Sequence, residues 1–279
     1  MLTVHTLTMS DQEYAQIRDL LYRKAGIALG PNKKPLVCGR LFKRVDALKM
    51  PSYGAYFSSL LNEQSAGELK TAIDLLTTNE TYFYREAAHF AQLQALARKA
   101  VERREPLSIW SAASSSGEEI YTIAMVLQQM ADTGLPLRWD ILGSDISSRV
   151  LETAARGVYP LDRVQKLPED LLRRYCLKGS GPAAGSVLVD KALRRKVRFT
   201  SINLIEPLPP IGPFDVIFLR NVLIYFDLPT KQKVVRSILS RLRPGGVLFV
   251  GMAESLNGVV GELQALSPGA YTVRSEASR

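Results

Sequence analysis

The sequence predicts an α/β protein, in which a small all-helical N-terminal domain precedes a doubly wound, mostly parallel sheet. Two observations lead to this class. Apolar residues recur at helical spacing in the N-terminal part, and no strand pattern appears before about residue 106. After that point short apolar strands alternate with amphipathic helices, the order expected when helices cover a parallel sheet. A length of 279 residues suits one such domain with a smaller one attached.

A capping box predicts where the first helix begins. Ser10 stands three residues before Glu13, and apolar residues at helical spacing follow until Gly26. The same spacing predicts further helices over residues 36–48, 53–61 and 66–76. We therefore expect a helical domain with its linker over residues 1–95.

Basic residues are concentrated in this helical domain. Lys and Arg number 36 against 27 Asp and Glu, a net charge of +9, and residues 18–50, with nine basic and two acidic side chains, account for +7 of it. Arg40, Lys43 and Arg44 share one face of the 36–48 helix, because positions three and four apart are neighbours. Such a face predicts an acidic partner: nucleic acid, anionic lipid or an acidic protein surface.

Strands and helices alternate through residues 96–279, which we assign to the second domain. The predicted strands are 107–112, 139–145, 214–219 and 246–252. The predicted helices are 118–131, 147–156 and 229–242. A glycine-rich loop with Gly179, Gly181 and Gly185 interrupts this order, and the strand-like segments 186–190 and 196–200 follow it. We expect about residues 176–200 to form a small antiparallel β insertion.

The composition excludes several classes of protein. Cys38 and Cys176 lie far apart, and with only His5 and His89 beside them they predict neither a disulfide framework nor a metal site. No window approaches 18 uncharged apolar residues, so no membrane-spanning helix is expected. The first residues have neither the basic nor the apolar region of a secretory signal. We therefore expect a cytoplasmic protein.

The carboxyl ends of the predicted strands are the expected ligand site, since ligands of doubly wound sheets bind at that edge. The first strand runs into a loop of small residues, 112–117, and then into a helix that starts with Glu118 and Glu119. Acidic side chains at a helix start disfavour a phosphate there. Asp145 ends the second strand and suits ribose hydroxyls. Singly these features are typical of ordinary turns and caps, but together they predict a positively charged nucleoside without phosphates, such as S-adenosylmethionine.

One segment resembles a family signature. Residues Asn79–Glu86, NETYFYRE, are similar to the N-x-T-x-F-F-R-E motif of the chemotaxis receptor glutamate methyltransferases, the CheR family. The resemblance continues in family order over roughly residues 11–273. Its further motifs are Trp110–Glu119, Gly143–Ile146, Asn203–Leu204 and Phe218–Phe226. The departures from the family pattern, which remove no group to which we assign chemistry, are Tyr84, Ile120, Leu219 and Met252–Glu254.

The resemblance implies a Rossmann-like S-adenosylmethionine-dependent methyltransferase that esterifies glutamate side chains of chemoreceptors, releases S-adenosylhomocysteine and uses no metal. It places Arg85 and Tyr225 nearest the transferred methyl group. It also implies a set of cofactor-binding residues: Asn79, Thr81, Arg85, Glu119, Asp145, Asn203, Leu204, Arg220 and Asn221. A glutamate with a pKa of about 4.3 is already ionised near neutrality, so positioning rather than a strong base is expected to set the rate.

The same resemblance implies the partners. These are the cytoplasmic domains of methyl-accepting chemoreceptors at inner-membrane clusters, to which the protein is recruited as a monomer, without inserting into the membrane. The face with Arg40, Lys43 and Arg44 is then expected to dock on acidic receptor helices. Family members with a long glycine-rich loop tether to a C-terminal receptor pentapeptide, so the loop 179–185 and its edge strand mark the expected tether. The alternative is an insertion that only covers the cofactor site.

Competing functions lack their motifs. A methyltransferase acting on nucleic-acid amino groups has a [DNS]-P-P-[YF] motif where this chain has Arg220–Leu223, and no Pro-Cys nucleophile is present, so no nucleic acid partner is expected. A nicotinamide dehydrogenase needs G-x-G-x-x-G after the first strand, and this chain does not have that motif there. A serine hydrolase of this fold needs a histidine after its serine, and none follows His89. A protein that binds cofactor and receptor without turnover stays open, although Arg85, Asp145 and Tyr225 argue against it.

Overall fold

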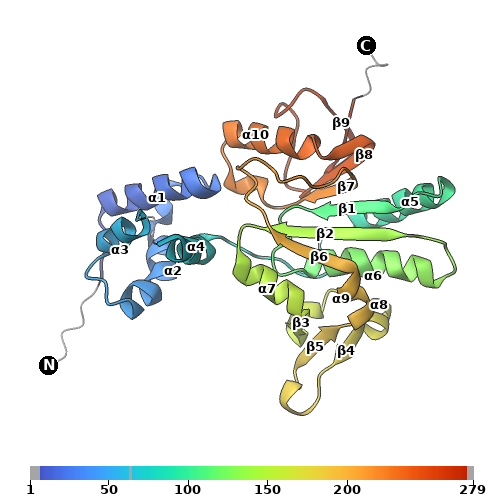
Figure 1. Ribbon diagram of the computed structural model, residues 1–279, viewed down its shortest axis with the longest axis horizontal. Coiled ribbons are helices and arrows are strands. Elements are labelled where there is room, and N and C mark those ends of the chain that lie inside the picture. Colours follow the sequence, from blue (N-terminus) through green and yellow to red (C-terminus); the bar gives the residue numbers. More distant parts are fainter. Residues whose placement is uncertain (1–6, 63–64, 275–279) are drawn as a thin grey trace. The chain divides into compact units, whose positions relative to one another are not determined.

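The computed structural model describes residues 7–62 and 65–274, which fold as two compact units (Figure 1). The helical unit extends to Thr78 and also includes Tyr225–Asp227. The sheet unit comprises Asn79–Ile224 and continues from Leu228 to the end of the described chain. Residues 79–95, which the sequence analysis groups with the helical domain as its linker, therefore lie in the sheet unit.

Amphipathic helices build the helical unit. They are α1 (Asp11–Ala25), α2 (Lys34–Ala47), α3 (Tyr53–Leu60) and α4 (Ala66–Leu76), with the short 3-10 helix η1 (Pro31–Lys33) before α2. The predicted capping box is confirmed at α1: the Glu13 amide donates to Ser10 Oγ (3.2 Å) and the Ser10 amide donates to Glu13 Oε2 (2.8 Å). The apolar faces of these helices bury a common core that includes Ile17, Leu41 and Tyr56.

The main sheet contains seven strands within the described residues, in the order β6-β2-β1-β7-β8-β10-β9. The strands are β1 (Leu107–Ser111), β2 (Trp139–Asp145), β6 (Val197–Ser201), β7 (Phe214–Leu219), β8 (Leu242–Val250), β9 (Leu263–Ser267) and β10 (Ala270–Val273). All pairs from β6 to β8 are parallel, and β10 pairs antiparallel with both β8 and β9. The chain leaves β1 in one direction towards β2 and β6, and returns on the other side at β7. This reversal between β1 and β7 is the switch point of a doubly wound sheet, as predicted.

Helices pack against this sheet (Figure 1). They are α5 (Ala88–Glu102), α6 (Glu118–Asp132), α7 (Ser148–Arg156) and α10 (Leu228–Leu239). Leu93 of α5 and Ile123 of α6 are fully buried in one core with Ile109 of β1 and Phe218 of β7. Within the described part of the chain, no helix has the length and apolar character needed to cross a bilayer.

A second, three-stranded sheet stands apart from the main one (Figure 1). Its strands are β3 (Val158–Pro160), β4 (Cys176–Lys178) and β5 (Ser186–Val189). Between β3 and β4 lie η3 (Leu161–Val164) and α8 (Glu169–Tyr175). The short helix η4 (Gly181–Ala183) lies between β4 and β5, and α9 (Lys191–Lys196) follows β5. Its order is β3-β5-β4, with antiparallel pairing. The predicted insertion is right for 186–189 and wrong for 197–200, which pairs in parallel with β2 as the edge of the main sheet. The alternation of apolar residues identifies a strand but not the sheet in which it finds its partner.

Candidate active site

The carboxyl ends of β1, β2 and β7 converge at the switch point. The loop after β1 is held between its neighbours, because the Ala112 amide donates to the Phe218 carbonyl (2.8 Å) and the Ser114 amide to the Ser144 carbonyl (2.9 Å). The loop of small residues, the end of β2 and the residues after β7 therefore meet at one edge of the sheet. This is the edge at which open α/β sheets bind ligands.

Gly117 closes this loop and begins α6. Its φ is +95°, and a Cβ there would lie 2.8 Å from Ala154 Cβ and 2.9 Å from Tyr159 Oη, so only glycine fits. Glu118, which follows, is buried and accepts a hydrogen bond from the Ser116 hydroxyl (2.7 Å). Burial raises the pKa of Glu118 above its ordinary value. The Glu118 carboxylate therefore makes its hydrogen bond within the loop itself.

Asp145 ties the small-residue loop to the end of β2. Its Oδ2 accepts from the Ser115 amide (2.9 Å) and its Oδ1 from the Ser147 amide (3.0 Å), and the residue is only 7% exposed. The Ser115 hydroxyl donates to the Asn79 carbonyl (3.0 Å), so the linker motif reaches the same loop. Asp145 is therefore held in a defined orientation at the end of β2, beside the small-residue loop.

Arg220, Glu119 and Glu86 form a buried charged cluster beside this loop. Arg220 Nη1 lies 2.8 Å from Glu119 Oε2, and its Nη2 lies 2.9 Å from Glu86 Oε2. Glu119 Oε1 also accepts from the Ser111 hydroxyl at the end of β1 (2.7 Å). The structure therefore brings two of the expected cofactor residues into direct contact. It adds Glu86, which sequence reasoning missed; its only signal was its place in the motif directly after Arg85.

The cluster holds more negative than positive charge. His89 is fully buried, and burial, followed by the nearby Arg220 charge, lowers its pKa to about 4, so it is neutral at pH 7. Although burial alone raises the pKa of Glu86, the Arg220 charge and the Met252 amide bring it below its ordinary value. Two carboxylates thus face one guanidinium. The net negative charge of this cluster favours a ligand with ammonium and sulfonium charges over an anion.

Glu254 fixes the loop that follows β7. Its Oε2 accepts from the amides of Asn221 and Gly251 (2.7 Å each), and its Oε1 from the amide of Ile224 (3.2 Å). Asn221 is held at a φ of +57°, a conformation that Asn tolerates better than most residues. Sequence reasoning placed Asn221 in the site but missed the buried carboxylate that holds it. Glu254 was visible only as one of the family departures.

Asn203 and Thr81 each take part in a hydrogen bond that involves the backbone. The Asn203 side chain accepts from the Ile205 amide (3.4 Å), which is ordinary turn geometry, and Leu204 is buried. The Thr81 carbonyl accepts from Arg163 Nη1 (2.8 Å), and Thr81 itself is buried.

Arg85 stays close to its own motif. Its Nη1 donates to the Glu80 carbonyl (3.1 Å), and its guanidinium carbon lies 5.4 Å from the centre of the Tyr82 ring. Lys166 Nζ lies 3.9 Å from the same ring centre, a second cation–π contact. Among the residues that the structure describes, Arg85 forms no ion pair with a carboxylate.

The remaining predicted residues belong to the helical unit and to the small sheet. Tyr225 belongs to the helical unit, where its carbonyl accepts from the Ala28 amide (2.9 Å). Arg40, Lys43 and Arg44 lie on α2 of that unit, where Arg44 pairs with Glu68. The predicted tether glycines 179, 181 and 185 lie in the connection between β4 and β5.

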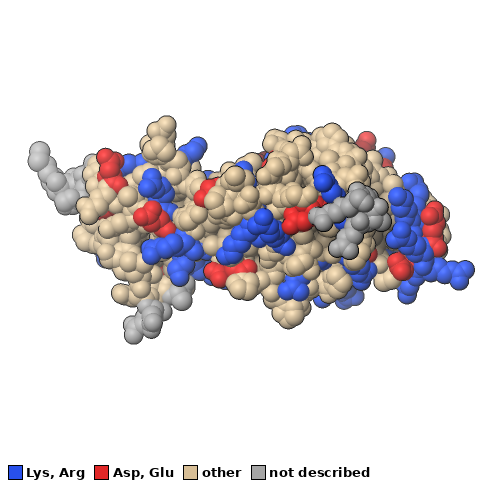
Figure 2. Space-filling model, turned by 90° about the horizontal axis from the view of Figure 1, so that it is seen from above, with Lys and Arg blue, Asp and Glu red and all other residues tan. Residues whose placement is uncertain are grey.

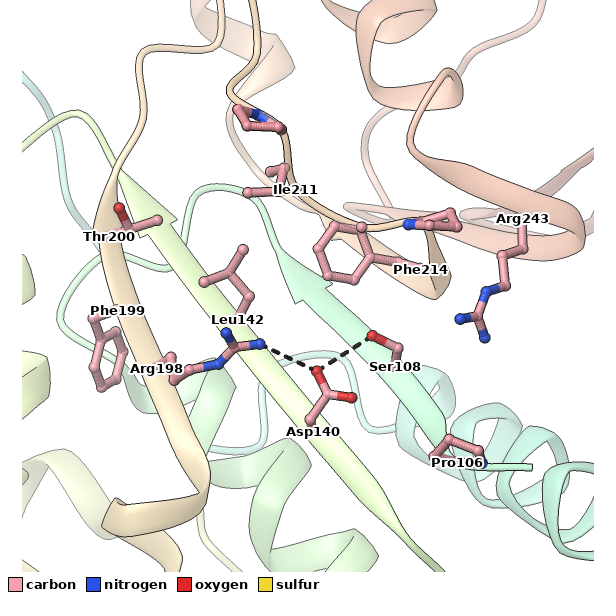
Figure 3. A pocket seen from close by; sticks show the side chains of 13 residues that line it. Pro106, Ser108, Asp140, Leu142, Arg198, Phe199, Thr200, Ile211, Phe214 and Arg243 are labelled. Carbon is pink, nitrogen blue, oxygen red and sulfur yellow. Dashed lines mark hydrogen bonds and ion pairs between the residues drawn. The ribbon is translucent and has the colours of Figure 1, made fainter. Parts of the chain in front are cut away.

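A cavity of about 580 Å³ lies at the opposite end of the strands (Figure 3). Its lining includes Ser108 and Asp140, near the starts of β1 and β2, together with Phe214 at the start of β7. Arg198 lies 3.5 Å from Asp140, so the charges at its wall are already paired. This cavity is therefore separate from the switch-point site. In the described residues, His, Cys, Asp and Glu side chains form no group of three or more that could hold a metal ion.

Family models match both parts of the chain. The CheR methyltransferase all-alpha domain matches residues 12–77, and the CheR methyltransferase SAM binding domain matches residues 79–271. The second match covers every residue described above at the switch point. Its start coincides with the first residue of the sheet unit.

Relatives extend along nearly the whole chain. The chemotaxis protein methyltransferase 2 of Pseudomonas aeruginosa is 42% identical over 246 residues, or 88% of this chain and 86% of that one. The chemotaxis protein methyltransferase of Salmonella typhimurium is 39% identical over 271 residues, or 97% and 93%. A solved structure, the N-methyltransferase NodS from Bradyrhizobium japonicum with S-adenosyl-l-homocysteine, aligns with a TM-score of 0.34 and 13% identity over 59% of this chain and 60% of that one. Because both domains match in order and the relatives cover both units, the chain belongs to the CheR methyltransferase family.

Proposed function

We propose that this protein transfers the methyl group of S-adenosylmethionine to glutamate side chains of chemoreceptors, forming methyl esters and S-adenosylhomocysteine. The observation that supports it best is the excess negative charge of the cluster of Glu86, Glu119 and Arg220 at the switch point. A cationic nucleoside is favoured at such a cluster because few waters screen buried charges. The SAM binding domain match includes these residues, and the relatives are named chemotaxis methyltransferases.

The proposed cofactor site uses the side chains of the switch point and no metal. When bound, S-adenosylmethionine supplies an electrophilic methyl group. Asp145 is proposed to accept from the ribose hydroxyls, and Glu119 to pair with the amino group. The other proposed contacts are Asn79, Thr81, Arg85, Asn203, Leu204, Arg220 and Asn221.

Arg85 is proposed to orient the acceptor glutamate, with Tyr225 nearby. A guanidinium matches a carboxylate with two parallel hydrogen bonds. The Arg85 charge is available for this because its contacts are a carbonyl and a ring rather than a carboxylate. An acceptor carboxylate needs no base, since it is ionised near neutrality. The protein is therefore proposed to orient the acceptor carboxylate and to exclude water.

Acidic helices of the receptor are the proposed partner of the helical unit. On the face seen in Figure 2, basic and acidic side chains lie interspersed among other residues. Arg40 and Arg44 are already engaged inside the helical unit, whereas Lys43 is exposed. Lys43 is therefore the sharpest test of the docking face formed with Arg40 and Arg44. We propose a cytoplasmic monomer that is recruited to receptor clusters at the inner membrane.

The second proposed contact is a receptor C-terminal pentapeptide on the small sheet. Among the residues that the structure describes, β4 pairs only with β5, and Leu177 on it is 59% exposed, so its outer edge offers backbone groups and an apolar side chain. Gly179 shapes the hairpin beside it, because a Cβ there would lie 2.0 Å from the Ala183 carbonyl oxygen. A weak tether of this kind raises the effective concentration of enzyme among receptor substrates.

Methyl transfer to receptors tests the proposed function. The full chain is incubated with chemoreceptor membranes and S-adenosylmethionine labelled in its methyl group. We expect label on the receptor that mild alkali releases as methanol, because esters hydrolyse and N-methyl groups do not. Receptors whose methylated glutamates are changed to alanine are the control. Label that resists alkali, or label on nucleic acid instead, would contradict the proposal.

A further inference from the structure

Arg220 joins two carboxylates that come from distant parts of the chain. Its Nη2 lies 2.9 Å from Glu86 Oε2 and its Nη1 lies 2.8 Å from Glu119 Oε2, with the arginine side chain 2% exposed. Nη2 also donates to the Arg85 carbonyl, and the guanidinium carbon lies 5.8 Å from the centre of the Phe90 ring. One guanidinium therefore holds both a proposed cofactor ligand and the backbone of the proposed acceptor-orienting residue.

Glu86 connects this guanidinium to a third segment. Its Oε2 also lies 3.2 Å from Arg220 Nε, so the two side chains meet through two nitrogens of the guanidinium. Its Oε1 accepts from the amide of Met252 (3.1 Å), the second residue after β8. The linker motif, the end of β7 and the end of β8 are therefore joined at one carboxylate.

The backbone on both sides of Arg85 is strained. Tyr84 has a φ of +59° and Glu86 a φ of +58°, values that residues with a Cβ rarely adopt. Such conformations persist where surrounding contacts determine them. The Tyr84 amide donates to Thr122 Oγ1 (3.1 Å) on one side, and the Glu86 carboxylate is fixed by Arg220 on the other. The conformation of Arg85 thus depends on the contact between Glu86 and Arg220.

A purely stabilising role does not account well for this cluster. A buried ion pair contributes little to stability compared with apolar groups of the same volume. His89 lies 3.5 Å from Glu86 but is neutral at pH 7, so among the described side chains Arg220 alone pairs as a cation with both carboxylates. If Glu86 lost its charge, Arg220 would be attracted to Glu119 only, and the carboxylate of Glu119 would be less free to meet a ligand.

We propose that Glu86 is a positioning residue for methyl transfer. It touches neither cofactor nor acceptor in this proposal, which rests on the proposed function. By holding Arg220, Glu86 divides the guanidinium between two carboxylates, and it keeps Glu119 and the Arg85 backbone in the geometry that the reaction requires. Small displacements of such groups are costly to the rate, because the reaction depends on alignment.

The test compares Glu86→Gln with Asp215→Asn in the full chain. Asp215 is a matched control, because it also pairs with an arginine, Arg243 (3.0 Å), and accepts from a backbone amide, that of Ser108 (2.7 Å), but at the opposite end of the sheet. We expect Glu86→Gln to lower kcat by about 10- to 100-fold and to raise the Kd for S-adenosylhomocysteine by calorimetry, with the KM for receptor nearly unchanged. We expect Asp215→Asn to lower the Tm while kcat and Kd stay near wild type.

Two results would overturn the inference. One is a Glu86→Gln variant whose kcat and Kd both stay within about twofold of wild type. The other is an Asp215→Asn variant that loses kcat and affinity to the same extent as Glu86→Gln. The effect of Glu86 would then be one of general stability and not of positioning. If Glu86→Gln does not fold, Glu86→Asp keeps the charge and shortens its reach, and an unchanged kcat and Kd in it overturns the inference equally. Failure of the proposed function is separate: wild type would then form no alkali-labile ester, while the calorimetric test of Glu86 still applies.

Discussion

Arg40 Nη1 lies 2.6 Å from the carbonyl oxygen of Leu76, so a residue of the basic face of α2 caps the last turn of α4. The same guanidinium donates to the Thr77 carbonyl (3.2 Å) and to Thr78 Oγ1 (2.9 Å). A cation is favoured at a helix C-terminus, where unpaired carbonyls and the helix dipole are negative. Arg40 therefore stabilises the end of the helical unit, in addition to any role in docking.

Lys43 and Arg40 are expected to behave differently when changed to alanine. Lys43→Ala should leave the Tm nearly unchanged, raise the KM for receptor and flatten its dependence on salt, because an exposed charge supplies screened attraction. Arg40→Ala should lower the free energy of unfolding by about 1–3 kcal/mol, since it leaves charged hydrogen bonds unmade. Thermal denaturation and steady-state kinetics at two salt concentrations separate these effects. An unchanged KM in Lys43→Ala would remove α2 from the docking surface.

Asp145→Asn is expected to weaken the binding of S-adenosylhomocysteine by about 10- to 100-fold, because a charged hydrogen bond contributes about 1.5–3 kcal/mol. Asparagine keeps one oxygen, which can accept from the amide of Ser115 or of Ser147 but not from both, so the loop loses one of these hydrogen bonds where alanine would lose both. Asp140→Asn is the control, since Asp140 lies on the same strand near its other end. Calorimetry on both variants is the measurement, and equal affinities would exclude Asp145 from the site.

Arg85→Ala is expected to lower kcat much more than it raises the Kd for the cofactor. The reason is that Arg85 has no carboxylate partner among the described residues and is free to orient an acceptor. Arg85→Lys should recover only part of kcat, because an ammonium lacks the planar fork of a guanidinium. Single-turnover kinetics at saturating cofactor give the rate, and calorimetry the affinity. Equal losses in both quantities would make Arg85 a cofactor ligand only.

The two edges of the small sheet provide a paired test of the tether. Leu177 on β4 and Val158 on β3 both lie opposite Leu188 of the central strand and are both exposed. If the peptide adds to β4, its binding should be lost in the Leu177→Asp variant and retained in the Val158→Asp variant. The probe is a synthetic pentapeptide with aromatic and acidic side chains and a free C-terminus, titrated by fluorescence. No saturable binding to the unaltered protein at millimolar concentration would leave only a covering role for the insertion.

His89 makes the stability depend on pH between about 6.5 and 4. Burial, together with the Arg220 charge, lowers its pKa in the folded protein from 6.5 to about 4. The unfolded chain therefore binds more protons in this range, and the free energy of unfolding falls as the pH is lowered, by about 3 kcal/mol from this group. Urea denaturation at pH 7, 5 and 4 measures it. In His89→Gln that part of the slope should vanish, whereas an identical slope would assign the effect to other groups such as Glu86.

Local patterns in the sequence predicted many of the elements and the edge of the sheet at which the site is expected, but not α5, α8, β9 or β10. The capping box at Ser10 is a contact within four residues, so its pattern alone predicts the start of α1. The position of the strand ends could also be predicted, because a doubly wound order brings the carboxyl ends of β1, β2 and β7 to one edge. Asp145 and Glu119 could therefore be assigned from their positions, and the family motif added Arg85 and Arg220.

Only the tertiary structure decided which partners these elements and side chains meet. Val197–Ser201 has the alternation of a strand, but whether it joins β2 or the small sheet depends on pairing with a segment far away in the chain. The cluster is similar: Arg220 meets Glu86 across 134 positions and Glu119 across 101. Local periodicity carries no information over such separations, because the contacts follow from the crossing of β7 beside β1. The sequence by itself thus predicted the alternation of strands and helices and the edge at which a ligand is expected, whereas the fold determined that Glu86 and Glu119 share one buried arginine.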